Sequence, residues 1–281
     1  MKKFLSIISV IILAASAIYI YARFIEPNFL IVHYENIKNS RISESIEDLK
    51  ILQLSDMHIS EYFDEKDLVK VVEKINEEAP DIVVFTGDLI DEYNKYENKD
   101  NVNKIWEAMK YINAPLGKYA IYGNHDYGGG AERVYKMVME NSGFILLKNE
   151  KITLEDYNIN IIGMDDSIFG NFEKEKLINF LDDDSYNIVL SHEPDVVDYL
   201  LEYNIDLFLS GHSHGGQVNL PLVNSLPLLA KKYTGGIYSF NNYRQTILYV
   251  NIGLGTSQMP LRFMAPPELS VFMLKSMNNE Q

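Results

Sequence analysis

The sequence contains no cysteine. Disulfide bonds are therefore excluded, and so are zinc sites built from thiolates. For the same reason, the redox state of the compartment cannot be read from the thiols. Any metal ion that the chain binds must be held by histidine, aspartate, glutamate, asparagine or backbone oxygen.

Positive charge is also in short supply. The chain has 25 lysine and arginine residues against 40 aspartate and glutamate residues, and its formal net charge is -15. Nucleic-acid backbones repel a protein with this charge, which argues against general binding to DNA or RNA. We therefore expect no nucleic-acid partner.

The overall composition is that of a globular protein. The chain has 281 residues, of which 47% are hydrophobic and 23% are charged. This length suits one large α/β domain or two small ones, with ample material for a core. No internal repeat is detectable in the sequence.

One hydrophobic run, from Phe4 to Ala22, carries no charge. As a helix that rises about 1.5 Å per residue it would span about 28 Å, close to the roughly 30 Å of a bilayer's hydrocarbon core. Lys2 and Lys3 precede the run and favour an amino terminus left in the cytoplasm. We therefore expect a single-pass anchor in the cytoplasmic membrane, with the rest of the chain outside.

Two alternatives to the anchor remain open. Ala15-Ser16-Ala17 resembles a cleavage site, so the run could be a signal peptide, and a buried helix of a soluble protein is the third possibility. With these alternatives, we divide the chain into an anchor or signal at residues 1–23, a connector at 24–48 and one domain at 49–281.

The domain alternates between apolar runs typical of buried strands and stretches with helical periodicity. Strands are predicted at 50–55, 81–86, 118–122, 187–191 and 206–210, and helices at 65–79, 102–112, 131–140, 173–181 and 194–202. Strand–helix alternation followed by further strands occurs twice. The pattern predicts an α/β fold, a four-layer αββα sandwich of two mixed β-sheets flanked by helices.

An apolar loop broken by prolines is expected at residues 220–230. It could form a lip for an apolar substrate or for the membrane, or it could pack over the edge of a sheet.

Polar residues suited to metal binding follow the predicted strands. They are Asp56, His58, Asp88, Asn124, His125, His192, His212 and His214. Five of the six histidines belong to this set. Because ligands of α/β sheets bind at the carboxyl ends of strands, these side chains are expected to converge on one rim.

The donor set predicts the metal and its chemistry. Oxygen and nitrogen ligands without sulfur suit manganese, iron or zinc, with manganese the first choice. The ligands are too many for one ion of low coordination number, so we expect two divalent metal ions that share a carboxylate. Such a pair activates a bridging water and clamps a phosphoryl oxygen, which favours phosphoryl transfer to water.

Five short motifs resemble the calcineurin-like metallophosphoesterases. They are Asp56-Met57-His58, Gly87-Asp88, Gly123-Asn124-His125-Asp126, Ser191-His192 and Gly211-His212-Ser213-His214. By this resemblance, one metal is held by Asp56, His58, Asp88 and His214, and the other by Asp88, Asn124, His192 and His212. The resemblance also implies that His125 lies beside the scissile phosphate and that Asp126 orients it. A metal-bridged hydroxide would attack phosphorus in line.

Motifs near the carboxyl terminus extend the resemblance to one particular branch of the family. Together with the anchor and Gly215-Gly216-Gln217, the stretches Gly253–Ser257, Pro260–Arg262 and Pro266–Glu268 resemble a membrane-tethered bacterial branch of the family. That branch includes phosphoesterases of the YaeI and YkuE type and calcineurin-like UDP-diacylglucosamine pyrophosphatases. Arg262 is a candidate for substrate binding, and a structural salt bridge is the equal alternative.

The expected function is therefore metal-dependent hydrolysis of phosphodiester or phosphomonoester bonds at the membrane. One alternative is cleavage of a lipid-linked or nucleotide-sugar pyrophosphate. Another, of a different class, is a metal-binding module without catalytic activity. The sequence leaves the natural substrate, the native metals and the oligomeric state open.

Overall fold

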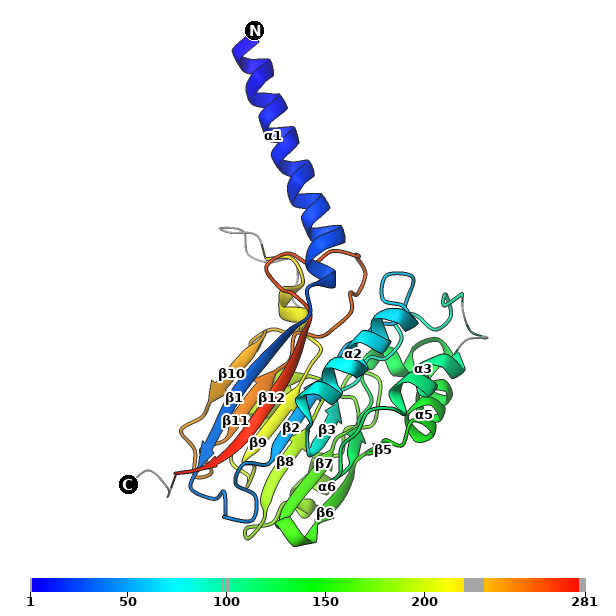
Figure 1. Cartoon of the computed structure of the whole chain (residues 1–281). Coiled ribbons are helices and arrows are strands. Elements are labelled where there is room, and N and C mark those ends of the chain that lie inside the picture. Colours follow the sequence, from blue (N-terminus) through cyan, green and yellow to red (C-terminus); the bar gives the residue numbers. More distant parts are fainter. Residues whose placement is uncertain (1, 98, 100–101, 220–229, 278–281) are drawn as a thin grey trace.

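The apolar run at the amino terminus forms a separate helix. A computed structural model describes residues 2–97, 99, 102–219 and 230–277. Helix α1 (Lys2–Ile20) has no buried residue and projects from the folded body (Figure 1). A π-helical turn (Tyr21–Ile25) and a 3-10 turn (Glu26–Asn28) follow it. Within the described residues, the stretch Lys2–Asn28 is long and apolar enough to cross a membrane.

The first sheet has six strands in the order β1-β12-β2-β3-β4-β5. Their bounds are Ile31–Asn39 (β1), Glu268–Ser276 (β12), Lys50–Leu54 (β2), Ile82–Phe85 (β3), Lys118–Ala120 (β4) and Ile145–Leu146 (β5). β12 pairs antiparallel with β2, and the other neighbours are parallel. The carboxyl ends of β2, β3 and β4 therefore meet at one edge of this sheet.

The second sheet has the order β10-β11-β9-β8-β7-β6. Its strands are Gly236–Ser239 (β10), Ile247–Val250 (β11), Leu207–Ser210 (β9), Tyr186–Leu190 (β8), Ile159–Gly163 (β7) and Glu150–Leu154 (β6). The four central strands are parallel, and β10 and β6 pair antiparallel at the two sides. Both sheets are mixed, as the sequence predicts.

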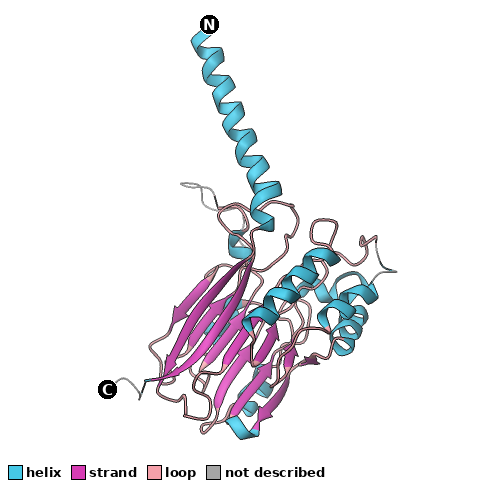
Figure 2. Cartoon of the chain, viewed as in Figure 1, coloured by secondary structure: helices cyan, strands magenta, loops and turns pink. Residues whose placement is uncertain are grey.

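Alternating side chains of the strands build separate layers of core. In β3, Val83 and Phe85 pack toward α2 (Glu65–Glu78), α3 (Val102–Met109) and α5 (Ala131–Asn141). Ile82 and Val84 point the other way, into the core between the two sheets. A third core lies between the second sheet and α6 (Lys174–Phe180) with a 3-10 segment (Pro194–Tyr199). The order helix, sheet, sheet, helix confirms the predicted four layers (Figure 2).

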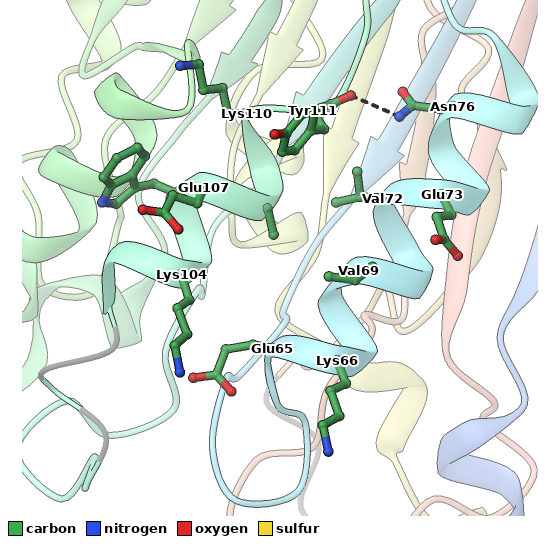
Figure 3. Close-up of a pocket in the computed structure, with 12 residues that line it drawn as sticks. Glu65, Lys66, Val69, Val72, Glu73, Asn76, Lys104, Glu107, Lys110 and Tyr111 are labelled. Atoms are coloured by element: carbon green, nitrogen blue, oxygen red, sulfur yellow. Dashed lines mark hydrogen bonds between the residues drawn. The ribbon is translucent and has the colours of Figure 1, made fainter.

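Helix α2 shows why its boundaries fall where they do. Asp64 caps its start, because the carboxylate accepts from the N–H groups of Lys66 at 2.8 Å and Asp67 at 3.2 Å. Ala79, in the left-handed region, and Pro80 end it. An exposed groove of about 1140 Å³ separates α2 from α3 (Figure 3). Asn76 closes one end of this groove through a hydrogen bond to the Tyr111 carbonyl at 2.9 Å.

The expected connector, in which residues 29–34 could form an edge strand, does contribute one: β1 runs along the whole length of β12 at the edge of the first sheet. One predicted helix takes a different form. The helix expected at 194–202 is a 3-10 segment, which begins with Pro194 at its first position. Of the apolar loop expected at 220–230, residues 220–229 lie outside the described residues.

Candidate metal centre

The polar residues that follow the parallel strands converge on one edge of the sandwich. β2 and β3 deliver Asp56, His58 and Asp88; the short helix α4 (Asn124–Tyr127), which follows β4, delivers Asn124; β8 and β9 deliver His192, His212 and His214. All seven are buried except Asn124, which is half-buried. Both sheets therefore contribute to the same cluster.

The backbone that carries these residues is strained. Five of them have positive φ angles: Asp56 (47°), His58 (43°), Asp88 (62°), His212 (69°) and His214 (51°). The left-handed region costs a non-glycine residue roughly 1–2 kcal/mol, and such strain tends to collect at functional sites. Close packing enforces it: a Cβ on Gly123 would lie 2.3 Å from Asp88 Oδ1, and one on Gly211 would lie 2.3 Å from Asp56 Oδ2.

The first ligand group surrounds one point. His58 Nε2 and His214 Nε2 are 3.0 Å apart. Asp56 Oδ1 lies 3.4 Å from the His214 nitrogen and 3.9 Å from the His58 nitrogen. Asp88 Oδ2 lies 3.5 Å from His58 Nε2. Two imidazole nitrogens and two carboxylate oxygens therefore face one another.

A second group lies on the other side of Asp88. Asp88 Oδ2 is also 3.2 Å from His192 Nε2. Asn124 Oδ1 lies 3.2 Å from the same histidine nitrogen and 2.9 Å from His212 Nδ1. The single oxygen Asp88 Oδ2 thus stands between the two groups.

This arrangement fits two divalent cations. Ring nitrogens and carboxylate oxygens offer lone pairs, and side chains with lone pairs gather this closely when a cation can be their common partner. Each group supplies four donors, with Asp88 counted in both, and none is sulfur. The donor set therefore suits manganese, iron or zinc.

The charges of the cluster are strongly coupled. Burial opposes the charge of Asp88, but His192 and His125 hold the pKa of its carboxyl well below the usual range. Burial and His192 lower the pKa of His212 to about 4, and burial keeps the pKa of His214 well below its ordinary value. Asp88 is therefore ionised while His212 and His214 are neutral, which are the states that bind a metal.

His58 behaves differently. Burial opposes its charge, but Asp56, Asp91 and Asp88 together raise its pKa to about 10, and Asp88 likewise holds the pKa of His192 well above its ordinary value against the effect of burial. A metal that binds there would displace the proton, so metal binding and proton release are coupled.

Partners outside the cluster fix the orientation of two rings. His58 Nδ1 lies 3.0 Å from Asp91 Oδ1, and His192 Nδ1 lies 2.7 Å from the Thr86 carbonyl. These contacts turn both Nε2 atoms toward the centre, as partners of metal-ligating histidines commonly do. Asp91 is not among the site residues that the sequence predicts. The signal in the sequence is its position three residues after Asp88, because a carboxylate this close in the chain can turn back to the same site.

His125 lies at the open side of the cluster. Its side chain is 23% exposed, and its ring stands edge-on to that of His58 at a centroid distance of 4.6 Å. Its backbone N–H donates to Asp88 Oδ1 at 2.8 Å, and its Nδ1 contacts the carbonyl of Asp91. Because that carbonyl only accepts, Nδ1 carries a hydrogen and Nε2 is left for a substrate.

Asp126 is buried and contacts the backbone rather than the His125 ring. Its carboxylate accepts from the N–H groups of Asp88 and Gly123 at 2.8 Å and of Leu89 at 2.9 Å. Burial and the charge of Asp88 raise its pKa to about 7. The contacts show a carboxyl group that holds the Asp88 loop against the start of α4. The expected orientation of His125 is instead provided by Asp91.

Arg262 is fully buried behind the cluster. Its guanidinium donates to the carbonyls of Gly255 at 2.6 and 2.9 Å, Ala265 at 2.7 Å and Ile252 at 3.0 Å. Its own N–H donates to the Ala22 carbonyl at 2.9 Å. These bonds favour the structural interpretation of Arg262, although its partners are carbonyls and not a carboxylate.

Comparison with known proteins agrees with this geometry. A sequence model of the calcineurin-like phosphoesterase family matches residues 49–216. The uncharacterized metallophosphoesterase YkuE of Bacillus subtilis is 42% identical over 271 residues, which cover 95% of this chain and 93% of that protein. The UDP-2,3-diacylglucosamine pyrophosphatase LpxG of Chlamydia trachomatis is 30% identical, over 92% of this chain and 93% of its own length.

Among solved structures, a dimetal phosphatase from Danio rerio superposes with a TM-score of 0.53. The match covers 82% of this chain and 93% of that one, at 12% sequence identity. At this identity the likeness concerns the fold alone.

Proposed function

The chain belongs to the calcineurin-like phosphoesterase family and is a hydrolase of phosphoric esters; from this premise we propose that it cleaves phosphodiester or phosphomonoester bonds with two metal ions at a membrane surface. The observation that carries the proposal is the position of Asp88 Oδ2. It lies 3.5 Å from His58 Nε2 and 3.2 Å from His192 Nε2, between two complete groups of ligands.

We propose one metal ion for each ligand group. Asp56, His58, Asp88 and His214 would hold one ion, and Asp88, Asn124, His192 and His212 the other. Two divalent ions in these places would activate water as the nucleophile and neutralise the phosphoryl oxygens. We propose manganese as the native metal, with iron or zinc as alternatives, because the donors are imidazole, carboxylate and amide.

The side chains of the protein supply the remaining chemistry. His125 would be the proton donor for the leaving oxygen in its imidazolium form, in which Nδ1–H donates to the Asp91 carbonyl and the proton on Nε2 passes to the leaving oxygen. The Asp91 carboxylate orients the His58 ring from behind. Asp126 positions Asp88 through the backbone, and so acts on the centre without contact to a substrate.

The membrane placement rests on the length and apolar character of Lys2–Asn28, and the contacts at the foot of α1 show how the proposed anchor joins the folded body. The Ala22 carbonyl accepts from Arg262, and the Tyr21 ring meets the Phe263 ring at 6.1 Å, so the helix is joined to the folded body. Arg262 in turn holds the Gly255 carbonyl, and the Gly255 N–H donates to the Asp56 carbonyl at 2.8 Å. A short path of hydrogen bonds therefore links the anchor to the metal centre.

We place the anchor at residues 1–23 and the metallophosphoesterase domain at 49–281. Residues 24–48 connect them and add β1 to the first sheet. Lys2 and Lys3 favour a domain on the outer side of the cytoplasmic membrane. A reporter fused to the carboxyl terminus tests this orientation, and a cytoplasmic signal from that reporter would contradict it.

A second candidate function is cleavage of a lipid-linked or nucleotide-sugar pyrophosphate. Large apolar side chains stay exposed beside the foot of α1, among them Phe24 (59%), Met259 (42%) and Met264 (61%). They would lie next to the bilayer if α1 spans it, where a lipid substrate presents its head group. The Chlamydia trachomatis relative, a UDP-2,3-diacylglucosamine pyrophosphatase, supports the same substrate class.

The test uses the full chain in detergent, stripped of metal and reloaded with manganese. We expect metal-dependent turnover of an aryl phosphodiester or phosphomonoester that is lost in Asp88→Asn. If only a lipid-linked or nucleotide-sugar pyrophosphate is cleaved, the second candidate replaces the first. Metal binding without turnover of any of these substrates would instead indicate a binding module.

A further inference from the structure

A pocket beside the metal centre holds an aromatic side chain that the chemistry above does not use. Its volume is about 240 Å³. Asn124 and His125 line one side, where the pocket meets the metal centre, and Phe169 lines another. The third wall is the stretch Asp91–Asn94. We refer to this space as the Phe169 pocket.

The ring of Phe169 is the open apolar face of this pocket. Its side chain is 65% exposed. Tyr93, the other aromatic residue of the lining, packs against the core beneath α2 and α3, and the Lys99 ammonium lies 5.2 Å from its ring centroid. An exposed phenylalanine at the rim of an active site offers a flat surface for a ligand.

The loop that carries Phe169 is held rigidly. Asp166 Oδ1 accepts from three successive N–H groups, those of Ile168 at 3.1 Å, Phe169 at 2.5 Å and Gly170 at 3.2 Å. Asp165 Oδ2 accepts from the Asn171 N–H at 2.7 Å. The backbone that carries Phe169 is therefore fixed before a ligand arrives, which lowers the entropic cost of binding.

The same loop is attached to the metal centre on two sides. The Tyr127 hydroxyl, from the helix that carries Asn124, donates to Asp165. Ser167 donates through N–H and hydroxyl to Glu193 Oε2, at 3.1 and 2.8 Å, and Glu193 directly follows His192. Phe169 is therefore held in a defined place relative to both ligand groups.

We propose that the Phe169 pocket binds a neutral aromatic ring with hydrogen-bond donors, the chemistry of a nucleobase, attached to the phosphoryl group at the metals. This inference rests on the proposed function and names the substrate class of the same site. Phe169 supplies a stacking surface, and a cavity of about 150 Å³ already holds a benzene ring, so this pocket accommodates a base.

The wall formed by residues 91–94 favours ligands that donate hydrogen bonds and disfavours anionic ligands. Asp91, Glu92 and Asn94 bring acceptor oxygens to this wall; Asp91 Oδ1 also contacts His58 Nδ1 and Glu92 pairs with Lys95, but each carboxylate has lone pairs for further bonds. They would repel an anionic group and accept from the N–H groups of a base. Phe169 is therefore a residue that determines specificity and does not take part in bond cleavage.

The test compares two ligands that differ only in the base. Adenosine 5′-monophosphate and ribose 5-phosphate, each as its non-hydrolysable methylenephosphonate analogue, are titrated into the manganese-loaded full chain in detergent, and binding is followed by calorimetry. Base stacking predicts a preference of about 5- to 100-fold for the nucleotide. Phe169→Ala removes this preference and leaves the affinity for ribose 5-phosphate unchanged, whereas Phe169→Tyr retains it.

Ile168→Ala is the matched control, because Ile168 is 51% exposed on the same loop and does not line the pocket. Its nucleotide preference should equal that of the wild type. The proposal is overturned if the wild-type chain shows no preference, or if Phe169→Ala keeps the whole preference. Because binding is measured apart from turnover, a chain that prefers the nucleotide but cleaves no ester would refute the proposed function and support the pocket.

Discussion

The two ends of strand β9 both carry buried charged or titratable groups, and they treat them in opposite ways. At the amino end, Asp206 is completely buried. Arg41 Nε lies 3.2 Å from one of its oxygens, and Arg244 Nη1 lies 3.6 Å from the other. The Asn187 N–H adds a hydrogen bond at 2.8 Å. The charge is thus balanced by groups of the protein itself.

At the carboxyl end of β9, the neutral rings of His212 and His214 face other atoms that carry lone pairs, among them Asp56 Oδ1 at 3.4 Å from His214 Nε2. His214 Nε2 meets another imidazole nitrogen at 3.0 Å, and His212 Nδ1 meets an amide oxygen at 2.9 Å. The backbone there is left-handed, whereas Asp206 has an ordinary backbone. Burial of charge alone therefore does not mark a functional site. A functional site is marked instead by metal-ligating atoms that lie close together on a strained backbone.

Asp88→Asn should cause the largest loss of activity. The substitution removes the charge shared by both ligand groups, and we expect kcat/KM for the best aryl phosphoester to fall by more than about 10⁴-fold. Metal content, measured by mass spectrometry, should fall with it. The control is Asp81→Asn, at the amino end of the same strand β3, where the carboxylate only accepts from the Lys50 N–H. Full activity in Asp88→Asn would contradict the metal assignment.

His125→Gln should separate catalysis from metal binding. Loss of a positioned proton donor typically costs about 10²–10⁴-fold in rate. We expect a loss of about 10³-fold in kcat with unchanged metal content, checked on the same preparation. An equal loss of metal would show that His125 acts as a ligand.

Asp206→Ala should lower the stability of the fold through the amino end of β9 and leave the metal centre unchanged. Arg244, whose side chain is 1% exposed, would keep only the exposed Asp183 as a carboxylate partner. Removal of one partner from a buried ion pair costs about 3–5 kcal/mol of unfolding free energy. Denaturant unfolding measures this loss, while kcat of the folded enzyme should stay at the wild-type value. A reduced metal content would show that the two ends are not independent.

Asp91→Asn should have the smallest effect of the four. Asparagine can still accept from His58 Nδ1, but it lacks the charge that strengthens that bond. Loss of such outer partners lowers metal affinity by about 10–100-fold. A competition titration with a chelator measures this change. Asp67→Asn, a half-exposed carboxylate at the start of α2 that accepts from the Asp64 N–H, is the control and should bind metal normally.

Much of the fold was accessible from the sequence because apolar runs and helical periodicity report burial directly. The strand that ends before Asp56 and the helix that begins near Glu65 are such cases. Strand β1 was harder to place. It pairs with residues more than 230 positions away, and its half-buried edge position gives only a weak alternation.

The site was predictable in its donors and less so in its supporting residues. Histidines that follow strands stand out because each strand end points to the same rim. Asp91, in contrast, lies in a polar loop, and its contact with His58 depends on the course of that loop. For Arg262 the sequence left substrate binding and a structural salt bridge equally open, because the carbonyls that surround it come from the three-dimensional path of residues 252–265.

The central claim is that one carboxylate, Asp88, joins two metal sites. The most direct measurement is the number of metal ions per chain in the manganese-loaded full-length protein, determined by mass spectrometry against protein concentration. The account predicts two ions per chain in the wild type and at least one fewer in Asp88→Asn. A wild-type stoichiometry of one or none, or two ions retained in Asp88→Asn, would contradict it.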